Sequence, residues 1–109
     1  MATNQSTVDY ILEQINQAGP VRAKKMFGDY CLYCDEKVVA LVCDNELFVK
    51  VTVAGEAFLG KHEKRPAYPG AKPSLYISGD NWDDADWMAQ LIKISASELP
   101  KPKPKKRRK

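Results

Sequence analysis

Two very short connections between apolar segments constrain the fold of this chain more than any other feature. Residues 30–34, 37–43 and 46–51 are rich in β-branched and aromatic side chains, and only the dipeptides at 35–36 and 44–45 separate them. Two residues are enough for a β-hairpin, whereas parallel strands need a crossover of about a dozen residues. The spacing therefore predicts an antiparallel meander.

The middle segment of this meander is unusual because residues 38–43 are all apolar. Alternate side chains of a strand point to opposite faces of the sheet, so this strand is apolar on both. We therefore expect that both faces are covered, or that one face meets a second subunit. This run is also the longest apolar stretch of the chain, and it is too short to span a bilayer core of about 30 Å.

One stripe of apolar residues marks an amphipathic helix before the meander, formed by Val8, Ile11, Leu12 and Ile15. Ser6 and Asp9 have the spacing of a capping box at its start. Gly19 and Pro20 supply a glycine stop followed by a helix breaker. We expect this helix to lie on the sheet.

The remaining elements complete an α+β pattern. They are a short strand over 24–29 or the start of the next strand, a helix over 53–60, a strand over 74–78, and a final helix that starts within 80–86 and contains Trp87, Met88, Leu91 and Ile92. The expected order is α-β-β-β-(β)-α-β-α, with three helices packed on an antiparallel sheet as a two-layer domain over residues 1–98.

The positive charge of the chain is concentrated at its end. The basic residues there are Lys101, Lys103, Lys105, Lys106, Arg107, Arg108 and Lys109. They are seven of the 17 basic residues, so residues 1–100 hold ten basic residues against 14 acids, a net charge of −4. Residues 99–109 have nothing apolar to bury after Leu99, which predicts a disordered basic tail. Its role is either contact with DNA, RNA or another polyanion, or solubility alone.

A second basic segment is the loop expected from Lys61 to Lys72. It carries Lys64 and Arg65 beside Tyr68, a combination that can hold a phosphate and stack on a base. The alternative is an ordinary solvated surface loop.

Compartment and chemistry follow from the cysteines and the N-terminus. Three cysteines are an odd number for a disulfide scaffold, and residues 1–7 lack the basic and apolar regions of a signal peptide, so we expect a cytoplasmic protein with reduced thiols. Cys31 and Cys34 match C-x-x-C, and Cys43 and His62 would complete a zinc set. Residues three apart in a strand point to opposite faces, which favours structural thiols over a metal or redox site.

Neither the lone histidine nor the acidic cluster predicts catalysis. No nucleophile is placed beside His62 by any motif, and Asp80, Asp83, Asp84 and Asp86 lack the spacing of a calcium loop. Carboxylates at a helix start cap free amides and face the positive end of the helix dipole. We therefore expect no catalytic residues, no metal and no cofactor.

Several segments resemble the TfoX/Sxy family. Residues 22–35 resemble its R-x-x-x-M-F-G-G-Y-x-L-Y segment, and the resemblance continues through 39–42, 47–51, the 68–70 loop and the 82–84 helix start, covering about residues 7–98. It implies an α-β(3)-α-β(2)-α domain of the secretion-chaperone-like type. It also implies a link to natural competence, as a co-regulator associated with cyclic-AMP receptor protein, with no established enzymatic activity.

Two departures from the family pattern stand out. Asp29 occupies the position of the second glycine, where a positive φ is expected. The basic tail stands where full-length TfoX proteins continue into a helical second domain, so we expect a stand-alone module.

Our leading hypothesis is a non-enzymatic regulatory or adaptor domain. Its candidate contacts with a protein partner, such as the transcription machinery, or with a second copy of the chain are Arg22, Lys24, Met26, Phe27 and Tyr30. The alternative is that the last three of these are core residues. A second hypothesis is a nucleic-acid-binding protein that uses the tail and the 61–72 loop, and a third is a thiol or zinc protein. No membrane partner is expected.

Overall fold

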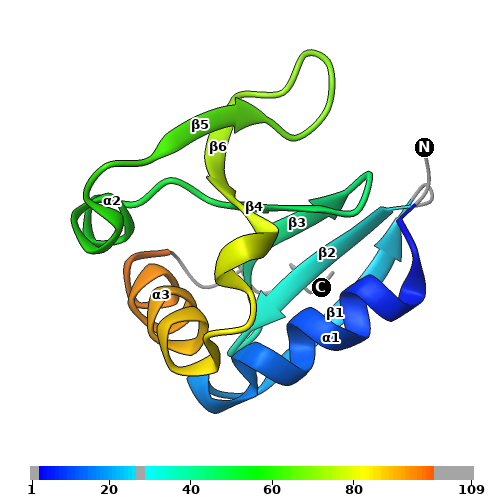
Figure 1. Ribbon diagram of the computed structural model, residues 1–109, viewed down its shortest axis with the longest axis horizontal. Helices are drawn as coiled ribbons and strands as arrows, with labels where there is room; N and C mark the ends of the chain where they lie inside the picture. The colour runs from blue at the N-terminus through cyan, green and yellow to red at the C-terminus, as the bar shows by residue number, and fades with distance from the viewer. Residues whose placement is uncertain (1–2, 27–28, 100–109) are drawn as a thin grey trace, which may run out of the picture.

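The computed structural model describes residues 3–26 and 29–99 (Figure 1). In these residues the helices are α1 (Gln5–Ile15), α2 (Val53–Leu59) and α3 (Ala85–Glu98), with short 3-10 turns at Asn16–Ala18 and Gly79–Asn81. The strands are β1 (Val21–Met26), β2 (Asp29–Cys34), β3 (Lys37–Cys43), β4 (Glu46–Val49), β5 (Glu63–Pro66) and β6 (Pro73–Ile77). The predicted α+β class is confirmed.

The described strands form a single antiparallel sheet in the order β1-β2-β3-β4-β6-β5. The two tight connections are hairpin turns with positive φ at both central residues: Asp35 (53°), Glu36 (66°), Asp44 (54°) and Asn45 (61°). Two consecutive positive φ angles are the signature of a type I′ turn, whose twist matches that of the strands it joins. The meander predicted from the two-residue spacing is confirmed.

One face of this sheet is covered by α1 and α3, which lie side by side in Figure 1. The shared core consists of Val8, Ile11, Ile15, Tyr30, Leu32, Cys34, Val39, Ala40, Val42, Leu47, Val49, Leu75, Ile77, Met88, Leu91, Ile92 and Ala96. Each of the large side chains in it stabilises the fold by about 1.5–3 kcal/mol through burial. The stripe predicted for the first helix is part of this core, with Leu12 at its margin.

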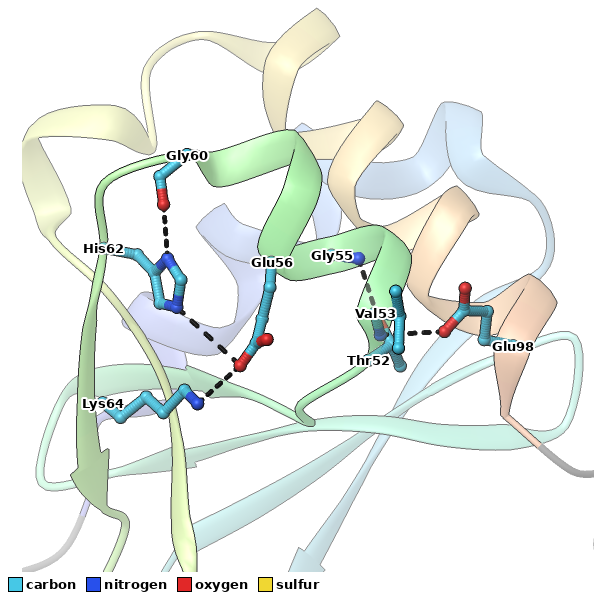
Figure 2. A network of polar contacts seen from close by, with 8 residues as sticks. All are labelled: Thr52, Val53, Gly55, Glu56, Gly60, His62, Lys64 and Glu98. Atoms are coloured by element: carbon cyan, nitrogen blue, oxygen red, sulfur yellow. Dashed lines mark hydrogen bonds and ion pairs between the residues drawn. The ribbon is translucent and has the colours of Figure 1, made fainter.

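Helix α2 lies against α3, and its first turn is held by two side chains (Figure 2). Thr52 Oγ1 accepts a hydrogen bond from Gly55 N at 2.9 Å. The carboxylate of Glu98 accepts from Val53 N at 2.9 Å and from Ala54 N at 3.1 Å. These three amides have no partner within the helix itself, so the end of α3 satisfies the start of α2.

The contact between α2 and α3 is close because it is made by small residues. Ser95 is fully buried, and its Oγ finds no hydrogen-bond partner among the described residues. A Cβ added to Gly55 would lie 3.1 Å from that Oγ and 2.7 Å from Thr52 Oγ1. Only glycine fits here without displacing a neighbour.

The first-helix start differs from the sequence prediction. Ser6 and Asp9 lie inside α1, and the residue before the helix, Asn4, makes no side-chain cap. The capping-box prediction was therefore wrong. The helix start is instead fixed by a distant turn, because Asn45 Oδ1 accepts from Asn4 N at 2.9 Å and from Thr7 Oγ1 at 3.1 Å.

Both edge strands also differ from prediction. The first strand begins at Val21 and ends at Met26, earlier than the expected 24–29, and Glu63–Pro66 forms β5 inside the expected 61–72 loop. Four strands thus precede α2, where the family resemblance implied three. Edge strands lack the apolar alternation of inner strands, and these two are held by backbone pairing with β2 and β6. Residues 100–109 of the predicted tail lie outside the described residues, and α3 ends at Glu98 with Leu99 as its C-cap.

Candidate partner-binding face

The face of the sheet opposite α1 and α3, here called the open face, carries a row of apolar side chains. The strand register aligns one residue from each strand across the sheet: Lys24, Cys31, Leu41, Phe48, Tyr76 and Glu63. The four central side chains are apolar or aromatic, and a charged residue stands at each edge. The apolar middle strand predicted from the sequence therefore has its second face here.

At the β1 end of the open face, an arginine is held in place by two neighbours. The Arg22 guanidinium lies 4.2 Å from the centre of the Tyr33 ring, and its Nη2 donates to Glu36 Oε1 at 3.0 Å. A cation over an aromatic face at an exposed site contributes about 0.5–1 kcal/mol. Lys24 and Lys25, on the same strand, have no carboxylate within ion-pair distance among the described residues.

The β5 end repeats this arrangement. The Arg65 guanidinium lies 4.1 Å from the centre of the Tyr76 ring, and its Nε donates to Glu63 Oε2 at 2.6 Å. Tyr76 packs in turn on Phe48, with the ring centroids 5.7 Å apart. The aromatic surface at this end is therefore already covered by protein groups.

Between these two ends the open face is hollowed. The hollow has a volume of about 450 Å³ and is lined by Met26, Asp29, Tyr30, Leu41, Cys43 and Tyr68. Met26 from β1 and Tyr68 from the β5–β6 loop are both exposed, at 38% and 55%. The carboxylate of Asp29 is engaged already, because its Oδ1 accepts from Thr3 Oγ1 at 2.8 Å and from Asp44 N at 3.1 Å. An apolar concavity with two exposed large side chains suits an apolar group of a partner.

The structure separates the five predicted partner-binding residues. The strand alternation places Arg22, Lys24 and Met26 on the open face of β1. Tyr30 is only 6% exposed, and its hydroxyl donates to Gln5 Oε1 at 2.9 Å, which joins β2 to α1. Phe27 lies outside the described residues.

The predicted nucleic-acid-binding residues that the structure describes are Lys64 and Arg65, and both are in ion pairs. Lys64 Nζ lies 2.5 Å from Glu56 Oε2, and Arg65 is bound to Glu63. A phosphate at either site would have to compete with a carboxylate that is already in place. The seven basic residues of the tail, from Lys101 to Lys109, lie outside the described residues.

The three cysteines are free and buried. Cys34 Sγ points toward the helices, 3.8 Å from Ala18 O, whereas Cys31 is on the open face, opposite Leu41. Burial raises the pKa of all three thiols, and it raises the pKa of Cys43 to about 11. In residues 3–26 and 29–99, no group of three His, Cys, Asp or Glu side chains is arranged to hold a metal ion.

His62 belongs to a small polar network that holds the C-terminal end of α2 (Figure 2). Its Nδ1 lies 2.6 Å from Gly60 O, and its Nε2 lies 3.8 Å from Glu56 Oε2. Lys64 Nζ donates a hydrogen bond to the Glu56 carboxylate in an ion pair, which lowers the pKa of Glu56. The network links α2 to β5 and presents no nucleophile next to the imidazole.

Two residues of the acidic cluster lie at the start of α3, and the other two lie before it. Asp84 is the N-cap, and its Oδ1 accepts from Trp87 N at 3.1 Å, while Asp86 lies in the first helical turn. Asp80 lies in the preceding 3-10 turn, and Asp83 accepts a hydrogen bond from the Tyr10 hydroxyl of α1. The capping interpretation is confirmed for Asp84.

Sequence reasoning did not single out Leu41, Cys43 or Tyr68 as parts of one surface. The signal for the first two was available, since an inner strand that is apolar on both faces must expose one face to something other than the helices. Tyr68 carried no such signal, because it reaches the hollow only through the course of the loop between β5 and β6 in the folded chain.

The family assignment rests on a match over most of the chain. The family model of the TfoX N-terminal domain matches residues 13–99. The chain belongs to this family. The chain is also similar to an uncharacterized 12.7 kDa protein in the trpE 5′ region of Spirochaeta aurantia, with 40% identity over 106 residues that cover 97% of this chain and 91% of the relative.

The charges of this TfoX-family domain divide between the segments that contain α1 and α3 and the segment between them. The segments that contain α1 and α3, 1–18 and 79–99, carry seven acids and one lysine, a net charge of −6. Residues 19–78, which contain all the strands, carry nine basic residues and seven acids, a net charge of +2. Among the described residues, the domain has no helix with the length and apolar character needed to cross a membrane.

Proposed function

We propose that this TfoX-family protein is a non-enzymatic regulatory or adaptor domain that binds a protein partner through the open face of its sheet. The observation that supports this most is the hollow between Met26 and Tyr68, an apolar concavity on the face that α1 and α3 leave uncovered. Exposed apolar surface of this kind marks sites of interaction in soluble proteins.

The family supplies the biological context of the proposal. TfoX-like proteins are linked to natural competence, so the proposed partner belongs to the transcription machinery or its regulators in the cytoplasm. The basic tail would add weak, sequence-independent affinity for DNA or RNA, which brings the domain close to its site of action without specifying it.

An affinity capture with a matched pair of variants tests this proposal. The bait is the full chain, and captures are made from host lysate with and without nuclease. Met26→Glu places a charge at the hollow, whereas Val53→Glu makes the same kind of change at an apolar residue of α2 that is 78% exposed and does not line the hollow. A protein partner that resists nuclease, is retained by Val53→Glu and is lost with Met26→Glu is the expected result.

Two results would count against the proposal. A partner retained equally by both variants would remove the open face from its role. Recovery of nucleic acid alone, lost when residues 101–109 are deleted, would favour a nucleic-acid-binding protein that acts through its tail.

A further inference from the structure

The two edges of the sheet differ in whether they can accept another strand. The outer backbone groups of an edge strand are a template for pairing with a further chain. At one edge, β5 ends in Pro66, and its Lys64 and Arg65 side chains are held by Glu56 and Glu63. Proline and fixed charges are common ways of blocking an edge. At the other edge, β1 contains no proline, and none of the described strands pairs with its outer side.

The hollow lies beside this available edge. Met26, the last residue of β1, lines it together with Leu41 and Cys43 from β3. Side chains two residues apart on a strand point to the same face and are about 7 Å apart. A strand added along β1 would therefore carry one side chain next to Met26 and another next to Lys24, both over the open face.

The charges along β1 indicate which kinds of side chain the added strand would carry. Lys24 and Lys25 have no ion-pair partner in the described residues, while Arg22 is bound to Glu36. The acid that lines the hollow, Asp29, already accepts two hydrogen bonds. The free charge at this edge is thus positive, and it is next to an apolar concavity.

We propose that the open face binds an extended peptide segment that adds a strand to β1, inserts an apolar side chain beside Met26, and places an acidic side chain two residues away beside Lys24. This inference rests on the proposed function, since it names the kind of partner segment that the open face would take. Main-chain pairing supplies affinity in such complexes, and the alternating side chains supply specificity.

Two other occupants fit this edge less well. A second copy of the chain would bring its own β1 lysines next to Lys24 and Lys25, and like charges on neighbouring strands are destabilising. A nucleic acid would find the guanidinium of Arg22 already paired with a carboxylate and an acid, Asp29, in the lining of the hollow.

The test begins with a random decapeptide display library selected on the immobilised full chain. Enriched peptides are expected to share an acid-x-apolar or apolar-x-acid pattern. One enriched peptide, labelled with fluorescein, is then titrated with the chain by anisotropy. Two alternately N-methylated versions each block the amides along one edge; the version blocked along the edge that faces β1 is expected to lose binding, and the other to retain it.

Charge variants then locate the contact. Lys24→Glu is expected to weaken binding of the labelled peptide about fivefold or more, from the loss and reversal of one charge pair. Lys93→Glu makes the same charge change on the exposed surface of α3 and is expected to leave the affinity unchanged. Backbone amide shifts in a nuclear magnetic resonance titration are expected to be largest in β1.

Each contrary outcome is separable from failure of the proposed function. Selection of basic peptides, binding that survives both patterns of N-methylation, or equal effects of Lys24→Glu and Lys93→Glu would overturn the inference even if Met26→Glu still abolishes capture of the partner. Displacement of the peptide by a single-stranded oligonucleotide of 20 thymidines, or a chain dimer that the peptide dissociates, would assign the β1 edge to a different occupant.

Discussion

Replacing Gly55 by alanine tests how tightly α2 is packed. The added methyl group would lie 2.7 Å from Thr52 Oγ1, 3.1 Å from Ser95 Oγ and 3.4 Å from Leu75 Cδ1. The Thr52 hydroxyl is not free to move, because it caps the helix by accepting from Gly55 N. Because Ser95 is fully buried, we expect the backbone of α2 to shift away from α3.

The expected magnitude is the difference between two effects. Overpacking a buried site costs about 1–3 kcal/mol. Alanine gains about 0.5–1 kcal/mol over glycine inside a helix. From the middle of each range, we therefore expect Gly55→Ala to lower the free energy of unfolding by about 1 kcal/mol. In a domain of this size, each kcal/mol corresponds to about 4–8 °C in melting temperature.

Urea denaturation monitored by circular dichroism measures this change. Ala57→Gly is the reverse substitution at an exposed position of the same helix, so its effect on stability measures the difference in helix propensity alone. Ser95→Ala removes the α3 hydroxyl that the added methyl would meet at 3.1 Å. The double variant Gly55→Ala/Ser95→Ala should therefore recover part of the loss, as a coupling energy between residues in contact. If Gly55→Ala is as stable as the parent or more stable, the close approach of α2 and α3 is not the constraint that we infer.

Three further predictions concern single groups. Glu98→Ala removes the acceptor of two α2 amides and should cost about 1 kcal/mol in urea unfolding, with Glu98→Gln costing less because it keeps an acceptor. The pKa of Cys43 is raised from 9.0 to about 11, so the unfolded chain loses its thiol proton first, and stability should fall as the pH rises from about 9 to 11; the fall should be smaller in Cys43→Ala. Lys64 lowers the pKa of Glu56 from 4.5, so their ion pair should stabilise the fold above that value and be lost as the pH falls below it. Glu56→Gln should therefore give a flatter dependence of melting temperature on pH in the acid range, and an unchanged slope would contradict the role of the pair.

The parts of the fold that could be predicted are those where local spacing leaves one solution. A two-residue connection permits only a hairpin, and four apolar residues at helical spacing permit only one buried stripe, so β2, β3, β4 and α1 follow directly. The edge strands could not be predicted in this way. Glu63–Pro66 has no apolar residue before its proline, and it is a strand because β6 offers it backbone partners.

The candidate site was predictable only in part for a related reason. The sequence predicted Met26 and two charged residues of β1 as partner contacts. The hollow also needs Tyr68, however, which is 42 residues away from Met26 along the chain. The helix cap was missed because its acceptor, Asn45, comes from a turn that is distant in sequence. Local patterns carry no information on such contacts.

The division of charge between these segments of the chain also affects how the domain meets other molecules before any contact is made. The segments of α1 and α3 carry −6 and the segment that contains the strands carries +2, so the domain has an electric dipole. An anionic molecule that diffuses toward it is repelled from α1 and α3 and attracted to the segment that contains the strands. At physiological ionic strength this acts over about 8 Å, and at 0.01 M salt over about 30 Å. The association rate constant of an acidic ligand should therefore rise as salt is lowered, through more productive collisions.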